Sequence, residues 1–446
     1  MKSVPYLKCL VIAALCLPVT AAAQNVLPTA VTPGDYIPVT DAEARLGQLL
    51  FWDPILSGNR NISCGTCHHP RFGTSDGVSL DLGEGGIGLG PARRPDPANM
   101  PEQRIPRNAP ALFNLGSPEF TALFVDGRIE TDPTRPSGLR TPLEDEMVSG
   151  FASLLSAQTM FPVLSADEMA GHYEENEIST AVRQGLITGP DGAWDRITQR
   201  VATIPAYADM FAAAYPEIAA GRRLAFTDIS NAIAGFVAFE WRSDSAPFDA
   251  WLRGDKAALS KQAQVGAALF YGPAGCAACH SGKFQTDHAF HAMGTPQLGP
   301  GKGERFERHQ RDTGRIRVTN RPEDAYAFRT PSLRNITVTA PYGHAGAHAT
   351  LAAFLAYHLN PKAGLASYQP QAILPDFSPE KPDWAIQADA QERDAIARAV
   401  TNPAVILTPT ETAAILAFLA ALEDPTALAG RLGIPAALPS GLPIDR

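Results

Sequence analysis

Two short motifs in this chain have the residues to hold a haem group. Cys64, Cys67 and His68 form a C-x-x-C-H sequence, the pattern of covalent c-type haem attachment, in which two thiols bond to one porphyrin and the adjacent imidazole ligates the iron. The pattern returns at Cys276, Cys279 and His280. A thioredoxin-type redox pair needs no following histidine, and the halves of a zinc site would not lie about 210 residues apart, each with its own histidine. The chain is therefore expected to bind two haem c groups covalently.

The first 23 residues have the composition of an export signal. Lys2 and Lys8 precede an apolar run over residues 10–19, and a row of small alanines ends at Ala23. We expect residues 1–23 to be cleaved near Ala23 and the mature protein to be periplasmic. No later stretch reaches the roughly 18 apolar residues that a membrane-spanning helix needs, so no membrane insertion is expected.

The cysteine count and the net charge bear on two further questions, whether the chain forms disulfides and which class of partner it binds. Of the six cysteines, two fall in the export signal and four belong to the two motifs, so no disulfide can form without destroying a haem site. The formal net charge is -9 at pH 7. An acidic balance argues against nucleic acid as a partner and is compatible with a basic redox protein.

The pattern of apolar residues predicts a mainly α protein with little β structure. Its 37 glycines and 39 prolines favour long ordered loops, above all over residues 72–107, and long loops in compact domains are usually functional. Two c-type cytochrome domains, residues 24–244 and 245–446, would each carry one haem. Leu-Phe-Trp-Asp-Pro at 50–54 and Leu-Phe-Tyr-Gly-Pro at 269–273 precede the two motifs, which indicates a duplicated unit.

One expected helix offers a second axial ligand for a haem iron. It runs from a Thr350 cap to Pro361, and its apolar side chains share one face with His358. We therefore expect His358 to lie on the buried side and to ligate the iron. Tyr357, rotated by about 100° around the helix, is an alternative ligand, because phenolate also binds haem iron. A histidine that is simply buried in the core is the third possibility.

Several further stretches accompany the two motifs: Pro106–Pro110, Phe124–Arg128, Phe328–Asn335 and Thr339–His344. Together they resemble the bacterial di-haem cytochrome c peroxidase and MauG superfamily, over nearly the whole mature chain. The resemblance implies that the N-terminal haem is the site of peroxide reaction, with His68 as its proximal ligand. The C-terminal haem would then be the electron-transfer centre.

The resemblance also implies how the first haem differs from that of many relatives. Peroxidases of the family often close it with a distal histidine in an Ile-Gly-His-Gly loop. The matching loop here, Ile87–Gly90, has Leu89 at that position. Leucine cannot ligate iron, so the first haem is expected to keep an open position, as in MauG-like members, unless Glu84 or His69 reaches it.

A distal acid and amide follow from the same resemblance. In the family they lie ten residues apart, and Glu168 and Gln158 match them here. A carboxylate above the iron can take a proton from one peroxide oxygen and return it to the other. The alternative is a surface glutamate in the first turn of a helix. The chain is longer than the short family pattern between Arg128 and Gln158.

The family's other ligands can also be placed. Its sixth ligand of the second haem lies fourteen residues after the histidine that matches His344, and His358 occupies that place. Its calcium ligands correspond to the Asn108 side chain and the carbonyls of Thr339 and Pro341, oxygen donors of the kind that Ca²⁺ prefers. One calcium ion is therefore expected beside the two haems.

Three functions are compatible with these residues. A peroxidase would reduce hydrogen peroxide at the first haem with electrons from a small c-type cytochrome or cupredoxin, and this is the preferred hypothesis. A MauG- or MbnH-like enzyme would use peroxide to oxidise residues of a partner protein. His358 in place of methionine favours it, whereas Val125 in place of the family's inter-haem tryptophan counts against it. A di-haem electron carrier is disfavoured by Glu168, Gln158 and Leu89. The tryptophans that could substitute for the missing one are Trp52, Trp194, Trp241 and Trp251.

Overall fold

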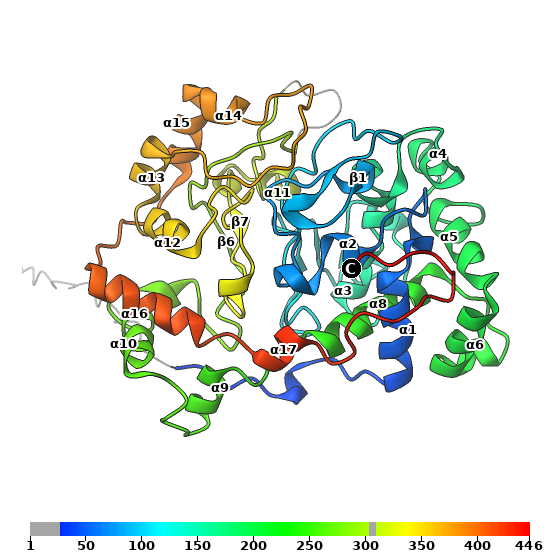
Figure 1. The fold of residues 1–446 in the computed structure, drawn as a ribbon, viewed down its shortest axis with the longest axis horizontal. Helices are drawn as coiled ribbons and strands as arrows, with labels where there is room; N and C mark the ends of the chain where they lie inside the picture. The colour runs from blue at the N-terminus through cyan, green and yellow to red at the C-terminus, as the bar shows by residue number, and fades with distance from the viewer. Residues whose placement is uncertain (1–26, 303–308) are drawn as a thin grey trace, which may run out of the picture.

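The computed structural model describes residues 27–302 and 309–446, so the export signal expected over residues 1–23 lies outside the described residues. Helices and loops make up nearly all of the described chain, and its strands are two or three residues long. The prediction of a mainly helical protein with little β structure is confirmed (Figure 1). In these two ranges, every helix is too short or too polar to cross a membrane.

The helices follow one another in two runs along the chain. The first run is α1 (Asp41–Trp52), α2 (Cys64–Cys67), α3 (Leu154–Thr159), α4 (Glu177–Arg183), α5 (Ala193–Ala202), α6 (Pro205–Ala214), α7 (Pro216–Ala219) and α8 (Phe226–Glu240). The second run is α9 (Pro247–Leu252), α10 (Lys261–Phe270), α11 (Ile316–Thr319), α12 (Leu351–Leu359), α13 (Pro361–Ser367), α14 (Ala385–Ala388), α15 (Ala390–Ala399), α16 (Pro409–Ala420) and α17 (Pro425–Ala429).

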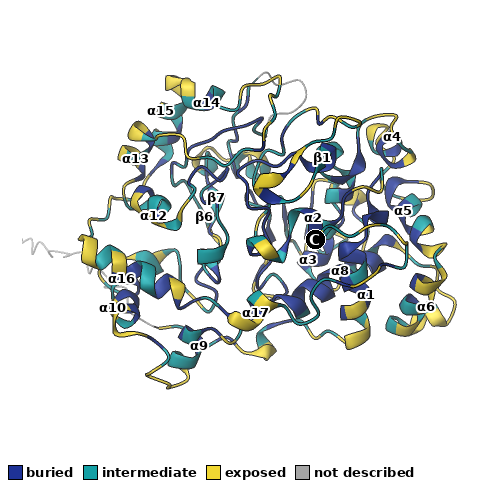
Figure 2. Cartoon of the chain, in the orientation of Figure 1, coloured by how far each residue is buried: buried dark blue, intermediate teal, exposed yellow. Residues whose placement is uncertain are grey.

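The strands of the described residues form three small antiparallel sheets. These are β1 (Gly86–Ile87) with β2 (Arg94–Pro95), then β3 (Ala122–Leu123), β4 (Ile129–Thr131) and β5 (Leu139–Arg140) in that order, and β6 (Phe290–His291) with β7 (Phe328–Arg329). All three are too short to form a core of their own. The hydrophobic core lies between helices instead, with α8 at its centre in the first half (Figure 2).

Helix α1 presents the first haem motif. The Thr40 hydroxyl accepts from the Glu43 N–H at 3.2 Å, and the Glu43 carboxylate accepts from the Thr40 N–H at 3.0 Å. This capping box satisfies two amides of the helix start. The helix ends at Trp52, whose ring lies against Gly65 between the motif cysteines. A Cβ at Gly65 would stand 2.3 Å from that ring, so the close approach requires glycine.

The two helices that lead into the haem motifs pack on their partners in the same way. Helix α1 meets α8 at Gly47, and α10 meets α16 at Gly266. A Cβ at Gly47 would stand 1.8 Å from the carbonyl oxygen of Ala232, and one at Gly266 would stand 1.9 Å from that of Ala414. The repeated contact agrees with the internal duplication that the sequence indicates.

The two ends of the chain cross between the halves. Near the N-terminus, the Asp35 carboxylate pairs with Lys283 of the second half at 2.5 Å. At the C-terminus, the hydroxyl of Thr66 in the first haem motif donates to Asp445 at 2.5 Å, and the segment after α17 packs on the core of the first half. The expected division between residues 244 and 245 stays a prediction, and each half is completed by a segment from the other.

The long loop over residues 72–107 is held in place by the second half. The Ser79 N–H donates to the Ile373 carbonyl at 2.8 Å, and the Ser79 hydroxyl donates to the Gly346 carbonyl at 2.6 Å. Further along, the Arg104 guanidinium is 2% exposed and pairs with Asp383 at 3.0 Å. Separating the Arg104–Asp383 ion pair would leave an uncompensated charge in the protein interior. The pair therefore holds the loop against the second half.

Gly47→Ala and Gly266→Ala are each expected to lower the free energy of unfolding by about 1–3 kcal/mol, because the added methyl group meets a backbone carbonyl in a packed interface. Chemical denaturation of the purified protein measures the change. Gly34→Ala is the control, since its Cβ would have only the Thr32 hydroxyl at 3.8 Å. Stabilities equal to wild type for both helix variants would contradict the packing described.

Candidate active site

The first haem motif holds its histidine in one orientation. Helix α2 ends at Cys67, and Nδ1 of His68 lies 3.0 Å from the carbonyl oxygen of Thr74. A carbonyl can only accept, so Nδ1 carries the hydrogen and Nε2 is left as the basic atom that can bind a metal. Burial lowers the pKa of His68, which keeps the ring in its neutral, ligating form.

The thiols of the first motif suit thioether bonds to a haem. Cys64 and Cys67 are free and partly buried. Burial raises the pKa of Cys64 to about 12 and raises that of Cys67 well above its ordinary value. A zinc site or a redox pair needs the charged thiolate, which this desolvated setting disfavours. A thioether sulfur carries no charge, so the environment fits covalently bound haem better than either alternative.

The second motif is built in the same way and has a partner opposite. Nδ1 of His280 lies 3.1 Å from the carbonyl oxygen of Gln285, and burial lowers the pKa of His280. Helix α12, capped by Thr350 as predicted, places the His358 ring centroid 6.1 Å from that of His280. Two metal–nitrogen bonds of about 2 Å, with a ring beyond each, need a separation of about 6 Å. The two imidazoles are therefore spaced to bind one metal from both sides.

Charge and contacts separate the two candidate ligands of α12. Burial, and to a smaller extent His280, lowers the pKa of His358 to about 4, so its ring is neutral. The Tyr357 hydroxyl donates to the Gly294 carbonyl, and its ring lies 4.7 Å from that of His348. Of the two, His358 is the one in ring contact with His280.

Gln158 and Glu168 lie on neighbouring short elements. Gln158 belongs to α3, and its Oε1 atom is buried without a hydrogen-bond partner among the described residues. Glu168 belongs to a single π-helical turn, Ala166–Ala170, and the Ser165 hydroxyl at its start accepts from the Glu168 N–H at 3.3 Å. Such turns are frequent at functional sites.

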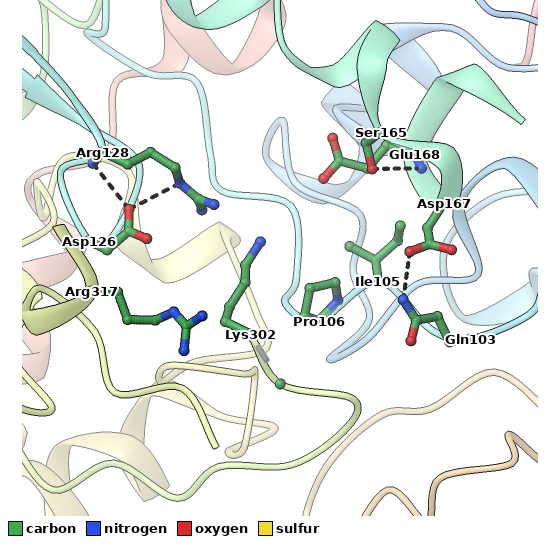
Figure 3. Close-up of a pocket in the computed structure, with 11 residues that line it drawn as sticks. Gln103, Ile105, Pro106, Asp126, Arg128, Ser165, Asp167, Glu168, Lys302 and Arg317 are labelled. Atoms are coloured by element: carbon green, nitrogen blue, oxygen red, sulfur yellow. Dashed lines mark hydrogen bonds and ion pairs between the residues drawn. The ribbon is translucent and has the colours of Figure 1, made fainter. Parts of the chain in front are cut away.

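Glu168 borders a cavity of about 250 Å³ (Figure 3). Charged side chains of both signs line it together with the glutamate: Asp126, Arg128, Asp167, Lys302 and Arg317. Burial raises the pKa of Glu168, and the nearby cations, first Lys302 and then Arg128, oppose that rise. The carboxyl lies in a cavity wall, which favours the predicted acid–base role over the alternative of a surface residue. Gln158 is not among the residues that line this cavity.

Glu84 and His69 are the side chains that could close the first haem in place of Leu89. Leu89 is partly buried in the loop after β1. Three asparagine side chains donate to the Glu84 carboxylate: those of Asn59, Asn61 and Asn99, at 2.7, 2.7 and 2.8 Å. The His69 ring packs edge-on against Trp52 with centroids 5.5 Å apart. The Nδ1 atom of His69 accepts from the Arg71 N–H at 3.1 Å, and its Nε2 atom is buried without a hydrogen-bond partner among the described residues. The contacts therefore account for Glu84 without an iron bond, and His69 stays the alternative that the sequence offered.

The expected calcium ligands are brought together in part. Nδ2 of Asn108 lies 3.4 Å from the carbonyl oxygen of Pro341, so these two residues are neighbours across the halves. The Thr339 hydroxyl donates to the Ile336 carbonyl at 3.0 Å. The calcium site stays a prediction.

Two partly buried arginines, Arg107 and Arg329, are functional candidates that the sequence analysis did not single out. Burial lowers the pKa of Arg329 to about 10, and its guanidinium donates to the Thr330 carbonyl at 3.3 Å. In the described part of the chain, no carboxylate forms an ion pair with it. Burial likewise lowers the pKa of Arg107 to about 10. Asp312 and Asp126 act on Arg107, whereas burial is the one cause of the lowered pKa of Arg329. A haem propionate would supply the negative charge that Arg329 lacks, so this arginine also fits the cofactor.

The backbone of Val125 contacts the second half of the chain. Its carbonyl accepts from the Arg329 N–H at 2.7 Å, and the ring of Phe124 lies 4.3 Å from the Arg128 guanidinium. Among the tryptophans, Trp52 lies beside the first haem motif, and its Nε1 atom is buried without a partner in the described residues.

His358→Met is expected to raise the reduction potential of one haem in the loaded protein by on the order of 100 mV, because a methionine ligand favours the reduced iron. Tyr357→Phe is the matched control on the same helix and should leave both potentials unchanged. Spectroelectrochemical titration measures both. A shift in the tyrosine variant and none in the histidine variant would assign the ligand to Tyr357 instead.

The sequence and the fold both match known di-haem enzymes. Residues 41–257 match the family model of di-haem cytochrome c peroxidase. The chain is 31% identical over 323 residues to the methylamine utilization protein MauG of Methylorubrum extorquens, covering 72% of this chain and 70% of that protein. It is 30% identical over 321 residues to the cytochrome c551 peroxidase of Pseudomonas aeruginosa, covering 72% of each.

Two solved structures share the fold. A MauG-like protein associated with microbial copper homeostasis superposes with a TM-score of 0.56 at 24% identity, over 92% of this chain and 96% of that one. The di-haem peroxidase BthA of Burkholderia thailandensis also gives 0.56, at 19% identity, over 96% and 97%. With the two haem motifs, the paired imidazoles and these relatives, the chain belongs to the di-haem cytochrome c peroxidase and MauG family and is a haem-dependent oxidoreductase.

Proposed function

We propose that this protein is a periplasmic di-haem peroxidase that reduces hydrogen peroxide beside Glu168. Its electrons would come through the C-terminal haem from a small c-type cytochrome or cupredoxin. The observation that carries the proposal is the difference between the two haem sites. His280 has an imidazole partner in His358, whereas the half that holds His68 has an acid in a cavity wall.

The cofactors divide the work between them. Haem c held by Cys64, Cys67 and His68 would supply an iron with a position open to peroxide, and haem c held by Cys276, Cys279, His280 and His358 would supply electron transfer. Overall, one peroxide molecule, two electrons and two protons give two water molecules.

The residues of the chain would manage the protons of this reaction. The Glu168 carboxylate accepts the proton of one peroxide oxygen and gives it to the other, which leaves as water. Gln158 has a buried Oε1 atom without a partner among the described residues, and in this proposal it would accept a hydrogen bond from a water molecule next to the acid, since it does not line the cavity itself. Thr74 and Gln285 hold the two motif imidazoles by Nδ1, which keeps Nε2 of each directed to its cofactor.

Oxidation of a partner protein is the second candidate. The 31% identity to MauG and the shared fold with a MauG-like protein favour it, as does a histidine at the position of the second haem's sixth ligand. Val125 counts against it, because the family's aromatic relay between the haems is absent there. We also propose that Asn108 and the carbonyls of Thr339 and Pro341 bind one calcium ion that stabilises the contact between the halves.

Steady-state turnover separates the two candidates. We expect the haem-loaded enzyme to consume hydrogen peroxide with a reduced small cytochrome or cupredoxin as the only donor, at two electrons per peroxide. Absorbance of the donor and a peroxide electrode measure the two substrates. Peroxide-dependent oxidation of a protein encoded nearby in the genome, without turnover of any such donor, would favour the MauG-like function.

Glu168→Gln is expected to slow the second-order reaction with hydrogen peroxide by about 100-fold or more, the usual contribution of general acid–base catalysis. Burial raises the pKa of Glu168 above its ordinary 4.5, and protonation removes the base. The wild-type rate should therefore fall as the pH drops through that raised pKa, and the variant should lack this fall. Stopped-flow spectroscopy measures the rate across pH.

The exposed Glu174 supplies the control for this experiment. Glu174→Gln should react with peroxide at the wild-type rate and keep the same pH profile. If Glu168→Gln behaved as this control does, Glu168 would have no part in the reaction.

A further inference from the structure

One lysine from the second half of the chain reaches into the cavity beside Glu168. Figure 3 shows the acidic turn on one side, the segment that follows β3 on the other, and a lysine side chain extending between them: Glu168 and Asp167, then Asp126 and Arg128, then Lys302. The lysine and the glutamate come from opposite halves of the chain. The cavity is therefore complete only when the halves are packed together.

Lys302 is the cation of this cavity whose charge is not already committed. Arg128 pairs with Asp126 at 3.1 Å and lies over the Phe124 ring. Arg317 also interacts with another group of the protein. Among the described residues, Lys302 forms neither a hydrogen bond nor an ion pair at bonding distance. Its charge therefore acts on the cavity as a whole.

The backbone before Lys302 is shaped to place it there. The Gly299 N–H donates to the Asp383 carbonyl at 2.7 Å, and the Gln310 side chain donates to the Gly299 carbonyl at 2.7 Å. Gly301 has φ of 70°, and a Cβ there would stand 1.9 Å from the carbonyl oxygen of Gln310. This path favours glycine at position 301, and the next residue, Lys302, lines the same cavity as Glu168.

We propose that Lys302 is a positioning residue for Glu168, whose ammonium group holds the glutamate in the ionised form that accepts the peroxide proton. The inference rests on the proposed function, since it concerns the same acid. In this proposal the Lys302 ammonium group, which belongs to the half with the electron-transfer haem, assists proton transfer by Glu168 in the other half. Loss of the lysine would leave the acid in place but protonated over more of the pH range.

The charges around Glu168 support this assignment. On its own turn, Asp167 disfavours a second negative charge, although Gln103 donates to Asp167 at 2.7 Å and His172 lies 3.7 Å from it. From the segment after β3, Asp126 largely offsets Arg128. Arg317 of α11 is the remaining charged group of the cavity. Burial raises the pKa of Glu168, and Lys302 opposes that rise more than any other group.

Three variants of the haem-loaded enzyme test the proposal. Lys302→Met should move the acid limb of the peroxide rate profile to higher pH by about one unit, the lower end of what one nearby opposite charge does to a carboxyl pKa. Lys302→Arg should restore the wild-type profile because it restores the charge. Lys362→Met, on the exposed surface of α13, is the control and should change nothing.

An infrared titration of the resting protein gives a readout independent of turnover. The carbonyl stretch of protonated Glu168, identified by its loss in Glu168→Gln, should appear at higher pH in Lys302→Met and at the wild-type pH in Lys302→Arg. An unmoved titration in Lys302→Met, or the same shift in Lys302→Arg, overturns the proposal. If Glu168→Gln itself keeps the wild-type rate and acid limb, the proposed function fails instead.

Discussion

A backbone carbonyl that holds a partly buried imidazole by Nδ1 is the contact on which both haem sites depend. Thr74 provides it for His68 and Gln285 provides it for His280, six and five residues after the respective histidine. In each case burial keeps the ring neutral, and the carbonyl fixes which nitrogen can bind iron. The helix that leads into each motif is fixed in turn by the same glycine-to-carbonyl approach, at Gly47 and Gly266.

On this duplicated frame the two sites differ in what lies near them. Helix α12 adds His358 opposite His280, a pair suited to a fully ligated iron that exchanges electrons. The first half instead has a π-helical turn that sets Glu168 in a cavity wall. The halves are not independent, because Lys302 reaches this cavity from the second half, and Thr66 of the first motif is covered by the C-terminal segment.

Local patterns predicted much of this from the sequence. The spacing of cysteines and histidines located both haem motifs, and the Thr350 cap begins α12 as predicted. Helical periodicity put His358 on the buried face of that helix, whereas the structure buries Tyr357 and leaves His358 partly exposed. The apolar repeats predicted a mainly helical chain because each helix buries one face. The role of Glu168 came from a family pattern, and its place in a cavity wall is consistent with that role.

The remaining features depend on contacts between residues far apart in the chain. Lys302 lies in a glycine-rich loop without periodicity, and nothing in its neighbours indicates that it meets residue 168. Arg329 lies in a stretch that resembles the family, but its sequence neighbours do not indicate the desolvation that lowers its pKa. That desolvation arises when the halves pack together. The sequence also does not indicate that each end of the chain packs on the other half. That arrangement depends on contacts between distant residues, such as the ion pair of Asp35 with Lys283.

If the two sites differ as proposed, one haem iron has two protein ligands and the other has one. Electron paramagnetic resonance of the oxidised, haem-loaded wild-type enzyme distinguishes these states. We expect one high-spin ferric signal from the haem at His68 and one low-spin signal from the haem held by His280 and His358. Two low-spin signals, with no high-spin component, would mean that a protein group closes the first iron and that the proposed difference between the sites is wrong.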